Sequence, residues 1–184
     1  RPVDSICLIS APTALVLAIP VTMMDRPIDS RGAMRVTDLE QRELLELDPA
    51  SGIIRFAGQR ALLVDAVAMG LLRKYLVENF GVHAARTVLT QFGFAHGWRL
   101  AESMQVELTW DTPEEWQRAS THLPALGGLF GIDPAGSDAL SDAGATLFAS
   151  YEAEQHLLHF GRSDVAACWT ICGLISGYLS RSTG

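Results

Sequence analysis

Cysteine is scarce in this chain, and basic residues are few. Three cysteines among 184 residues are too few for the disulfide framework of a small secreted protein, which favours a cytoplasmic location. The 14 Lys and Arg residues are outnumbered by 21 Asp and Glu, so the net charge is −7. A nucleic-acid-binding domain normally carries a basic face. Direct binding of DNA or RNA by this chain is therefore not expected.

The common sequence signatures of catalysis are also missing. The chain contains no G-x-S-x-G nucleophile turn, no P-loop and no H-E-x-x-H zinc motif. His96, within FGFAHG, could act as a general base, but no recognisable partner for it stands nearby in the sequence. The sequence therefore predicts a protein that is not an enzyme.

Long hydrophobic runs are absent except for ICLISAPTALVLAIPV near the start of the chain. This run contains Pro12 and Pro20 and is too short to cross a bilayer comfortably, so no membrane partner is expected. No A-x-A cleavage site follows it directly. A signal peptide and an apolar arm that packs on a partner or on the domain both stay open. Residues 1–34 are expected to form an arm and linker outside the main domain.

Hydrophobic periodicity predicts a mixed α and β chain in which helices dominate, with a few short strands. The helices are expected over about residues 38–47, 62–80, 83–104, from 113, 151–161 and 164–181. Gly81 should end the second helix, and Pro113 should open the fourth behind an Asp111 or Thr112 N-cap. Short strands are expected at GIIRFAG, GGLFGIDP and ATLFASYEAE. The predicted fold class is α+β, helix-rich with a small antiparallel sheet.

Two pairs of glycines occur at helical spacing. Gly93 and Gly97 lie four residues apart in one predicted helix, and Gly173 and Gly177 repeat the spacing in the last. Glycine at this spacing allows the backbone of another helix to approach closely.

One predicted helix carries Glu152, His156 and His159 on a single face. A carboxylate and two imidazoles are a ligand set for zinc or non-haem iron. The alternative is the polar face of an amphipathic helix, and a single helix cannot close a metal site.

The aromatic residues are spread over several predicted elements. They fit an ordinary core, and they also fit an apolar pocket with a few polar tips, the usual form of a small-molecule site. Composition alone does not separate these two interpretations.

A collinear set of segments over about residues 35–184 resembles the sensory region of XylR/DmpR-type transcription activators, which work with sigma-54. The matching pieces are Gln59-Arg60, the Gly-Val-x-x-Ala-Arg of 81–86, the Gly93/Gly97 helix with Ala101-Glu102, the Leu-x-Ala-Leu-x-Gly of 123–128 and the Cys-Trp…Gly-x-x-Ser-Gly-Tyr of 168–178. Together these pieces form a specific pattern, whereas each one alone is weak.

The resemblance implies a signal-reception domain that binds a small aromatic effector. In such regulators the domain restrains an attached AAA+ ATPase until the effector arrives, and the family members are homodimers in the cytoplasm. The resemblance implies an effector-binding domain over 35–144 and the start of a vinyl-4-reductase-type subdomain over 145–184. It also implies that Cys168 is a structural zinc ligand whose remaining ligands lie beyond Gly184.

Two positions depart from the phenol-responsive members of this family. Their phenol hydroxyl is held by a His in the Leu-x-Ala-Leu motif and by a Trp before the S-x-E-A-E motif, and here these positions are Pro124 and Leu147. A buried hydroxyl without a partner costs about 1–3 kcal/mol. The sequence therefore predicts a pocket that prefers an apolar or differently substituted aromatic compound.

The pocket is expected between the segment 116–126, the strand at 145–151 and the last helix. The residues expected to line it are Trp116, Leu123, Pro124, Leu147, Phe148, Tyr151, Ile171 and Tyr178. Two other classes stay open, a tetrapyrrole-related or other enzyme or binding protein of the vinyl-4-reductase type and a pure protein-interaction module. The first would carry a coloured cofactor or a titratable pair, and the second would have a filled core.

Overall fold

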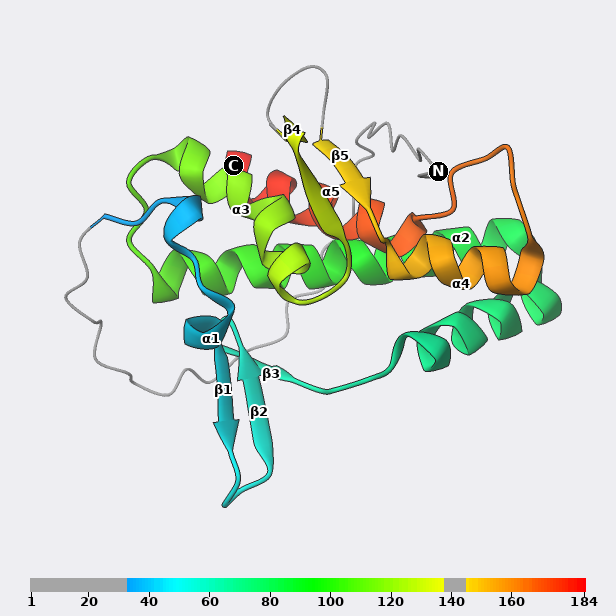
Figure 1. Ribbon diagram of the computed structural model, residues 1–184, viewed down its shortest axis with the longest axis horizontal. Helices are drawn as coiled ribbons and strands as arrows, with labels where there is room; N and C mark the ends of the chain where they lie inside the picture. Colours follow the sequence, from blue (N-terminus) through cyan, green and yellow to red (C-terminus); the bar gives the residue numbers. More distant parts are fainter. Residues whose placement is uncertain (1–32, 138–144) are drawn as a thin grey trace.

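The structure is a computed structural model, and it describes residues 33–137 and 145–184. It confirms a helix-rich α+β fold with small antiparallel sheets (Figure 1). In chain order the elements are the 3₁₀ helix η1 (Val36–Asp38), α1 (Gln41–Leu44), β1 (Leu45–Asp48), β2 (Ile53–Phe56), β3 (Gln59–Ala61), α2 (Ala66–Glu107), α3 (Pro113–Leu126), β4 (Gly131–Ser137), β5 (Ala145–Phe148), α4 (Tyr151–Phe160) and α5 (Trp169–Thr183). The predicted arm at 1–34 lies almost entirely outside the described residues.

The long helix α2 consists of two helical parts that meet at Gly81. Asp65 caps its start by accepting a hydrogen bond from the amide of Ala68 at 2.8 Å. Gly81 has φ 82° and ψ 161°, a backbone conformation that favours glycine. The chain turns sharply there, as the green ribbon of Figure 1 shows. The prediction that Gly81 ends a helix is confirmed.

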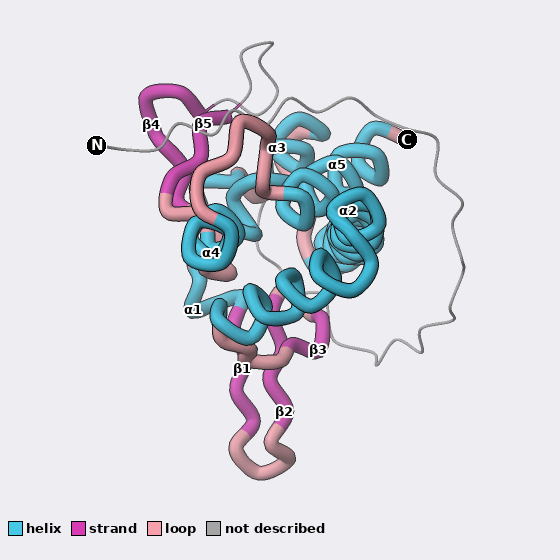
Figure 2. The backbone as a smooth tube through the Cα atoms, turned by 90° about the vertical axis from the view of Figure 1, so that its right-hand side faces the viewer, coloured by secondary structure: helices cyan, strands magenta, loops and turns pink. Residues whose placement is uncertain are grey.

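Strands β1, β2 and β3 form an antiparallel sheet that projects from the helices (Figures 1 and 2). Leu45 pairs with Phe56, and Ile54 pairs with Ala61. The predicted helix over 38–47 is therefore wrong in its second half, because residues 45–48 pair with β2. A helix of so few residues gains little, and pairing with a neighbouring strand outweighs it.

The remaining helices begin close to the predicted positions. The side chain of Thr112 caps α3 by accepting from the amide of Glu115 at 3.2 Å, and Pro113 is its first residue. The side chain of Ser150 caps α4 through the amide of Ala153 at 3.4 Å. Helix α5 starts at Trp169, five residues later than predicted.

Helices α2 and α5 pack backbone to backbone through the two glycine pairs. A Cβ atom on Gly93 would overlap the carbonyl oxygen of Thr170, and one on Gly97 would overlap that of Leu174. The same holds in reverse for Gly173 and Gly177, whose Cβ atoms would overlap carbonyl oxygens of α2. The close approach predicted from glycine spacing is confirmed, and it fixes α5 along the second part of α2.

The core contains two main groups of buried side chains, and α5 contributes residues to both. The first, here called the α2–α3 cluster, includes Leu100, Met104, Leu123 and Tyr178. The second, here called the sheet cluster, joins Phe130, Cys168, Ile171 and Ile175, with side chains of β4 and β5 packed against it. Since β4 and β5 pair with each other, the predicted boundary at 144/145 falls inside one hairpin.

Candidate functional site

The predicted pocket residues fall into both clusters rather than into one. Leu147, Tyr151 and Ile171 come together in the sheet cluster, with Cys168 beside them. Trp116, Leu123 and Tyr178 belong to the α2–α3 cluster. Three of the predicted residues thus meet in each cluster, and that they line an effector pocket stays a prediction.

The two remaining predicted lining residues differ in exposure. Pro124 lies within α3 and is buried, although a proline interrupts the hydrogen bonding of a helix interior. Phe148 is 52% exposed, and its ring lies against Gly131 of the paired strand β4. Of the eight residues, Phe148 is therefore the least enclosed.

Tyr178 carries a hydroxyl group in the interior, and its side chain is fully buried. Burial raises the pKa of this phenol well above its usual range, while the indole N–H of Trp116 beside it acts in the opposite direction. The hydroxyl is therefore neutral at physiological pH and offers a polar tip inside an apolar cluster.

A buried ion pair joins α2 to α4 next to the sheet cluster. Nη1 of Arg73 donates to Oε1 of Glu152 at 3.1 Å, and the two residues are 2% and 3% exposed. A buried charge is costly unless a partner compensates it. Each of these residues therefore depends on the other for its place in the interior.

Glu152 also caps helix α5 from a different helix. Its Oε1 accepts from the amide of Thr170 at 2.9 Å, and its Oε2 accepts from that of Ile171 at 3.1 Å. Cys168, the N-cap residue of α5, makes no capping bond with its side chain. The carboxylate therefore satisfies amides that a helix start leaves unpaired, and its charge suits the helix dipole.

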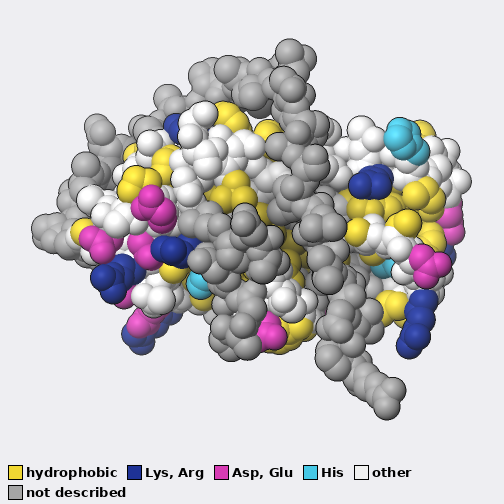
Figure 3. Space-filling view, turned by 90° about the horizontal axis from the view of Figure 1, so that it is seen from above, with side chains coloured by type: hydrophobic (Ala, Val, Ile, Leu, Met, Phe, Trp, Pro, Cys, Tyr) yellow, Lys and Arg dark blue, Asp and Glu magenta, His cyan; other side chains and the backbone are white. Residues whose placement is uncertain are grey.

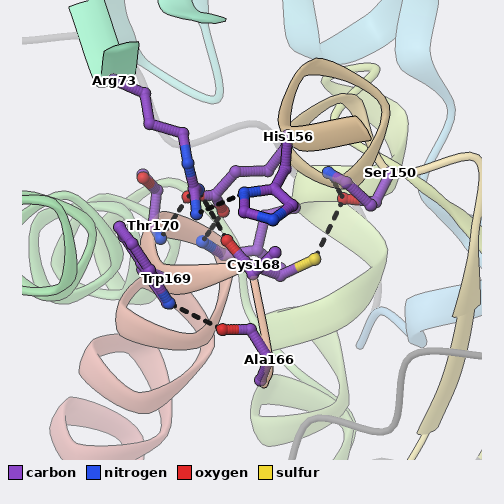
Figure 4. Close-up of polar contacts among 11 residues, drawn as sticks. Arg73, Ser150, His156, Ala166, Cys168, Trp169 and Thr170 are labelled. Carbon is purple, nitrogen blue, oxygen red and sulfur yellow. Dashed lines mark hydrogen bonds and ion pairs between the residues drawn. The ribbon is translucent and has the colours of Figure 1, made fainter. Parts of the chain in front are cut away.

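Arg73 holds the loop that leads into α5 (Figure 4). Its Nη1 donates to the carbonyl oxygen of Ala167 at 2.6 Å, and its guanidinium lies 3.8 Å from the centre of the Trp169 ring. Its Nη2 lies 3.4 Å from Nδ1 of His156. One cation thus contacts α4, the loop and the first residue of α5.

The titration behaviour of this network follows from burial. Burial raises the pKa of Glu152, while the amides of Thr170 and Ile171 and the charge of Arg73 act against that rise. Burial and the nearby guanidinium of Arg73 lower the pKa of His156. A neutral His156 can accept the hydrogen bond from Arg73 at Nδ1.

A cavity of about 10 Å³ lies beside the ion pair, between α2, α4 and α5. Arg73, Tyr151, Glu152, Gln155 and Thr170 are among the residues that line it. Its size is close to what one water molecule needs and is far below the volume of an aromatic ring. Tyr151 is the one predicted pocket residue that borders it.

The metal interpretation of Glu152, His156 and His159 is wrong within the described residues. The carboxylate of Glu152 is already used by Arg73 and two amides, and His156 faces the guanidinium of Arg73. The part of the chain that the structure describes contains no group of three or more potential ligands.

Cys168 is a free, buried cysteine whose Sγ lies 3.4 Å from Oγ of Ser150 (Figure 4). Burial raises the pKa of its thiol. A structural zinc ion needs four ligands, and the described residues around Cys168 do not provide them. Zinc binding at Cys168 therefore stays a prediction that depends on ligands from elsewhere.

Sequence reasoning missed Arg73 altogether. Its position in a helix of ordinary composition gave no sign of burial, because most arginines lie at the surface. Glu152 was noticed for its spacing to two histidines, but its partners are 79 residues earlier and 18 to 19 residues later. Only the packing of α2 against α4 and α5 brings these groups together.

Charged side chains of both signs are intermixed on the face shown in Figure 3. No helix in the described ranges is long and apolar enough to span a membrane.

The fold and the buried apolar clusters define a compact α+β domain without a catalytic constellation in the described residues. Residues 38–138 match a family described as "Activator of aromatic catabolism", the XylR_N family. This match covers more than half of the chain, and the chain belongs to that family. The family membership predicted from the sequence motifs is confirmed.

Two known proteins are similar to this chain, one in sequence and one in structure. The chain is 29% identical over 143 residues to the phenol regulator MopR of Acinetobacter guillouiae. The matched region covers 74% of this chain and 25% of the regulator. It thus spans about a quarter of that relative's length. The crystal structure of the phenol-responsive sensory domain of the transcription activator PoxR with phenol matches with a TM-score of 0.69 and 26% identity, covering 81% of this chain and 76% of that one.

These relatives are transcription regulators, in agreement with the expectation of a domain that is not an enzyme. The family match ends at residue 138. The assignment of 145–184 to a vinyl-4-reductase-type subdomain therefore stays a prediction.

Proposed function

We propose that this chain is the effector-sensing domain of a bacterial sigma-54-dependent activator and binds a small aromatic compound. The observation that supports this most is the likeness to the sensory domain of PoxR, which was solved with phenol, over 81% of this chain. In the full regulator, effector binding would release an attached AAA+ ATPase domain. Because that machinery acts on RNA polymerase, we expect the protein in the cytoplasm.

The sheet cluster is the proposed place of binding. Leu147, Tyr151 and Ile171 meet there between β5, α4 and α5, and they offer an apolar surface to an aromatic ring. Binding energy would come mainly from burial of apolar area, at about 25 cal/mol per Å². The cavity beside Arg73 is too small for an aromatic ring, so in this proposal the ring displaces side chains of the sheet cluster.

The effector is proposed to be an apolar benzenoid rather than phenol itself. Pro124 and Leu147 stand where phenol-responsive members carry hydrogen-bonding side chains, and neither can pair with a hydroxyl group. The similarity to phenol-responsive relatives supports an effector that contains an aromatic ring. Pro124 and Leu147 favour a ring without a hydroxyl group, such as benzene or an alkylbenzene.

A thermal-shift panel tests the proposed function. Benzene, toluene, xylenes, phenol and cresols are added to the folded domain, with cyclohexane as a non-aromatic control. We expect the hydrocarbons to raise the melting temperature more than the phenols do. A well-folded sample that none of the aromatic compounds stabilises would refute the aromatic-sensor function.

We also propose a homodimer. The first part of α2 exposes a row of apolar side chains at helical spacing, including Val67, Leu71 and Tyr75, which are half or more exposed in the single chain. Sedimentation velocity on the purified domain should give the mass of two chains, and a monomer at micromolar concentration would contradict this proposal.

A further inference from the structure

The start of α5 is held in place by two residues that belong to other helices. Glu152 accepts both hydrogen bonds from the amides of Thr170 and Ile171, and Arg73 binds the carbonyl oxygen of Ala167 just before the helix. Since the N-cap side chain of Cys168 makes no capping bond, these contacts from outside replace a local cap.

The same two residues adjoin the proposed binding surface without being part of it. Glu152 follows Tyr151 directly in α4, and it accepts a hydrogen bond from the backbone of Ile171. The side chains of Tyr151 and Ile171 pack in the sheet cluster, while the ion pair lies on the side toward α2. Moving the carboxylate would therefore shift two of the proposed pocket walls relative to each other.

The network has little freedom to rearrange. Both charges are almost fully buried, the guanidinium is stacked on Trp169, and the nearby cavity has room for about one water molecule. A planar guanidinium with several fixed donors holds such a geometry better than a flexible ammonium group does. The arrangement therefore preorganises the start of α5 before any effector arrives.

We propose that Arg73 and Glu152 are positioning residues for effector binding. They would set the geometry of the surface formed by Tyr151, Leu147 and Ile171 and would not touch the effector. This inference rests on the proposed function, because it assumes that the sheet cluster binds the aromatic ring.

The decisive variant is the double substitution Arg73→Met/Glu152→Gln. It removes both buried charges together, so neither is left without a partner, and the introduced glutamine still has one oxygen that can accept from an α5 amide. The matched control is Lys74→Met/Glu154→Gln, which makes the same kind of change at two nearby, more exposed charges on the same two helices.

The first readout is the Kd for toluene and for phenol, measured by calorimetry well below the melting temperature of every variant. We expect the double variant to bind the tighter of these two compounds at least tenfold more weakly than the wild type, and the control to bind it unchanged. A purely structural role would lower the melting temperature and leave this Kd unchanged. A folded double variant with wild-type Kd would overturn the proposal.

The second readout needs no ligand and separates this proposal from the proposed function. Amide hydrogen exchange should become faster at Thr170 and Ile171 in the double variant, while the glycine contacts of α5 further along keep their protection. If no aromatic compound of the thermal-shift panel binds the wild type, the proposed function fails, and this exchange measurement alone tests whether Arg73 and Glu152 position the start of α5. Unchanged exchange at both amides would then refute it.

Discussion

At the scale of single residues, Arg73 and Glu152 are the charged residues that are buried within the described part of the chain. Arg73→Met alone would leave the Glu152 carboxylate buried without its cation. We expect this change to lower the free energy of unfolding by about 3–5 kcal/mol. Adding Glu152→Gln should recover part of the loss. Urea unfolding followed by circular dichroism measures both, and a loss below about 1 kcal/mol in the single variant would contradict the structure.

His156, in the same network, should make the free energy of unfolding depend on pH. Burial and Arg73 lower its pKa in the folded state below the ordinary value of 6.5, so the unfolded chain binds more protons in the interval between the two values. Its contribution to stability is therefore present above about pH 6.5 and is lost as the pH falls. His156→Gln should flatten the fall in unfolding free energy between about pH 7 and 5, and an unchanged slope would argue against this assignment.

We propose that Pro124 and Leu147 decide which aromatic compounds are favoured. Pro124→His/Leu147→Trp restores the two hydrogen-bonding side chains found in phenol-responsive relatives. Each hydrogen bond to a buried hydroxyl contributes about 1 kcal/mol, so two of them should raise phenol affinity roughly 30-fold while toluene affinity does not rise. Calorimetry with both compounds measures this change. Equal gains for the two would show that the substitutions act through packing rather than through the hydroxyl.

At the scale of elements, the contact between α2 and α5 depends on glycine. In an isolated helix Gly→Ala stabilises by about 1 kcal/mol, but a Cβ at Gly97 would overlap the carbonyl oxygen of Leu174. Gly97→Ala should therefore cost about 3 kcal/mol of unfolding free energy. Gln91→Ala, at an exposed position of the same helix, is the control and should change it by less than about 0.5 kcal/mol. Similar stability of the two variants would exclude the close packing.

The elements also show what could be predicted from the sequence. Short sequence patterns indicated the break at Gly81, the capped start of α3 and the close helix contact at the glycine pairs. Each of these patterns lies within a few neighbouring residues of the sequence. The second half of the predicted helix 38–47 is β1 instead, since strand pairing with residues further along outweighed local preference. The Arg73–Glu152 ion pair could not be predicted from the sequence for the same reason, because the two residues meet only when α2, α4 and α5 pack together.

At the scale of the whole molecule, the described residues form one packed body in which α5 lies against the longest helix, α2. The predicted domain boundary at 144/145 lies between the paired strands β4 and β5. The segments before and after it therefore share the sheet cluster. The family could be predicted from several short motifs in a fixed order, and no single motif would have been enough. The structure distributes six of the eight predicted pocket residues equally over the sheet cluster and the α2–α3 cluster, so the place of the effector stays a proposal.

The central claim is that an aromatic effector binds in the sheet cluster. A crystal structure of the domain with the tightest-binding compound of the thermal-shift panel tests it most directly. We expect density for one ring bordered by Leu147, Tyr151 and Ile171, with the Arg73–Glu152 pair intact beside it. A ring bound among the residues of the α2–α3 cluster, or at the surface of the domain, would contradict it.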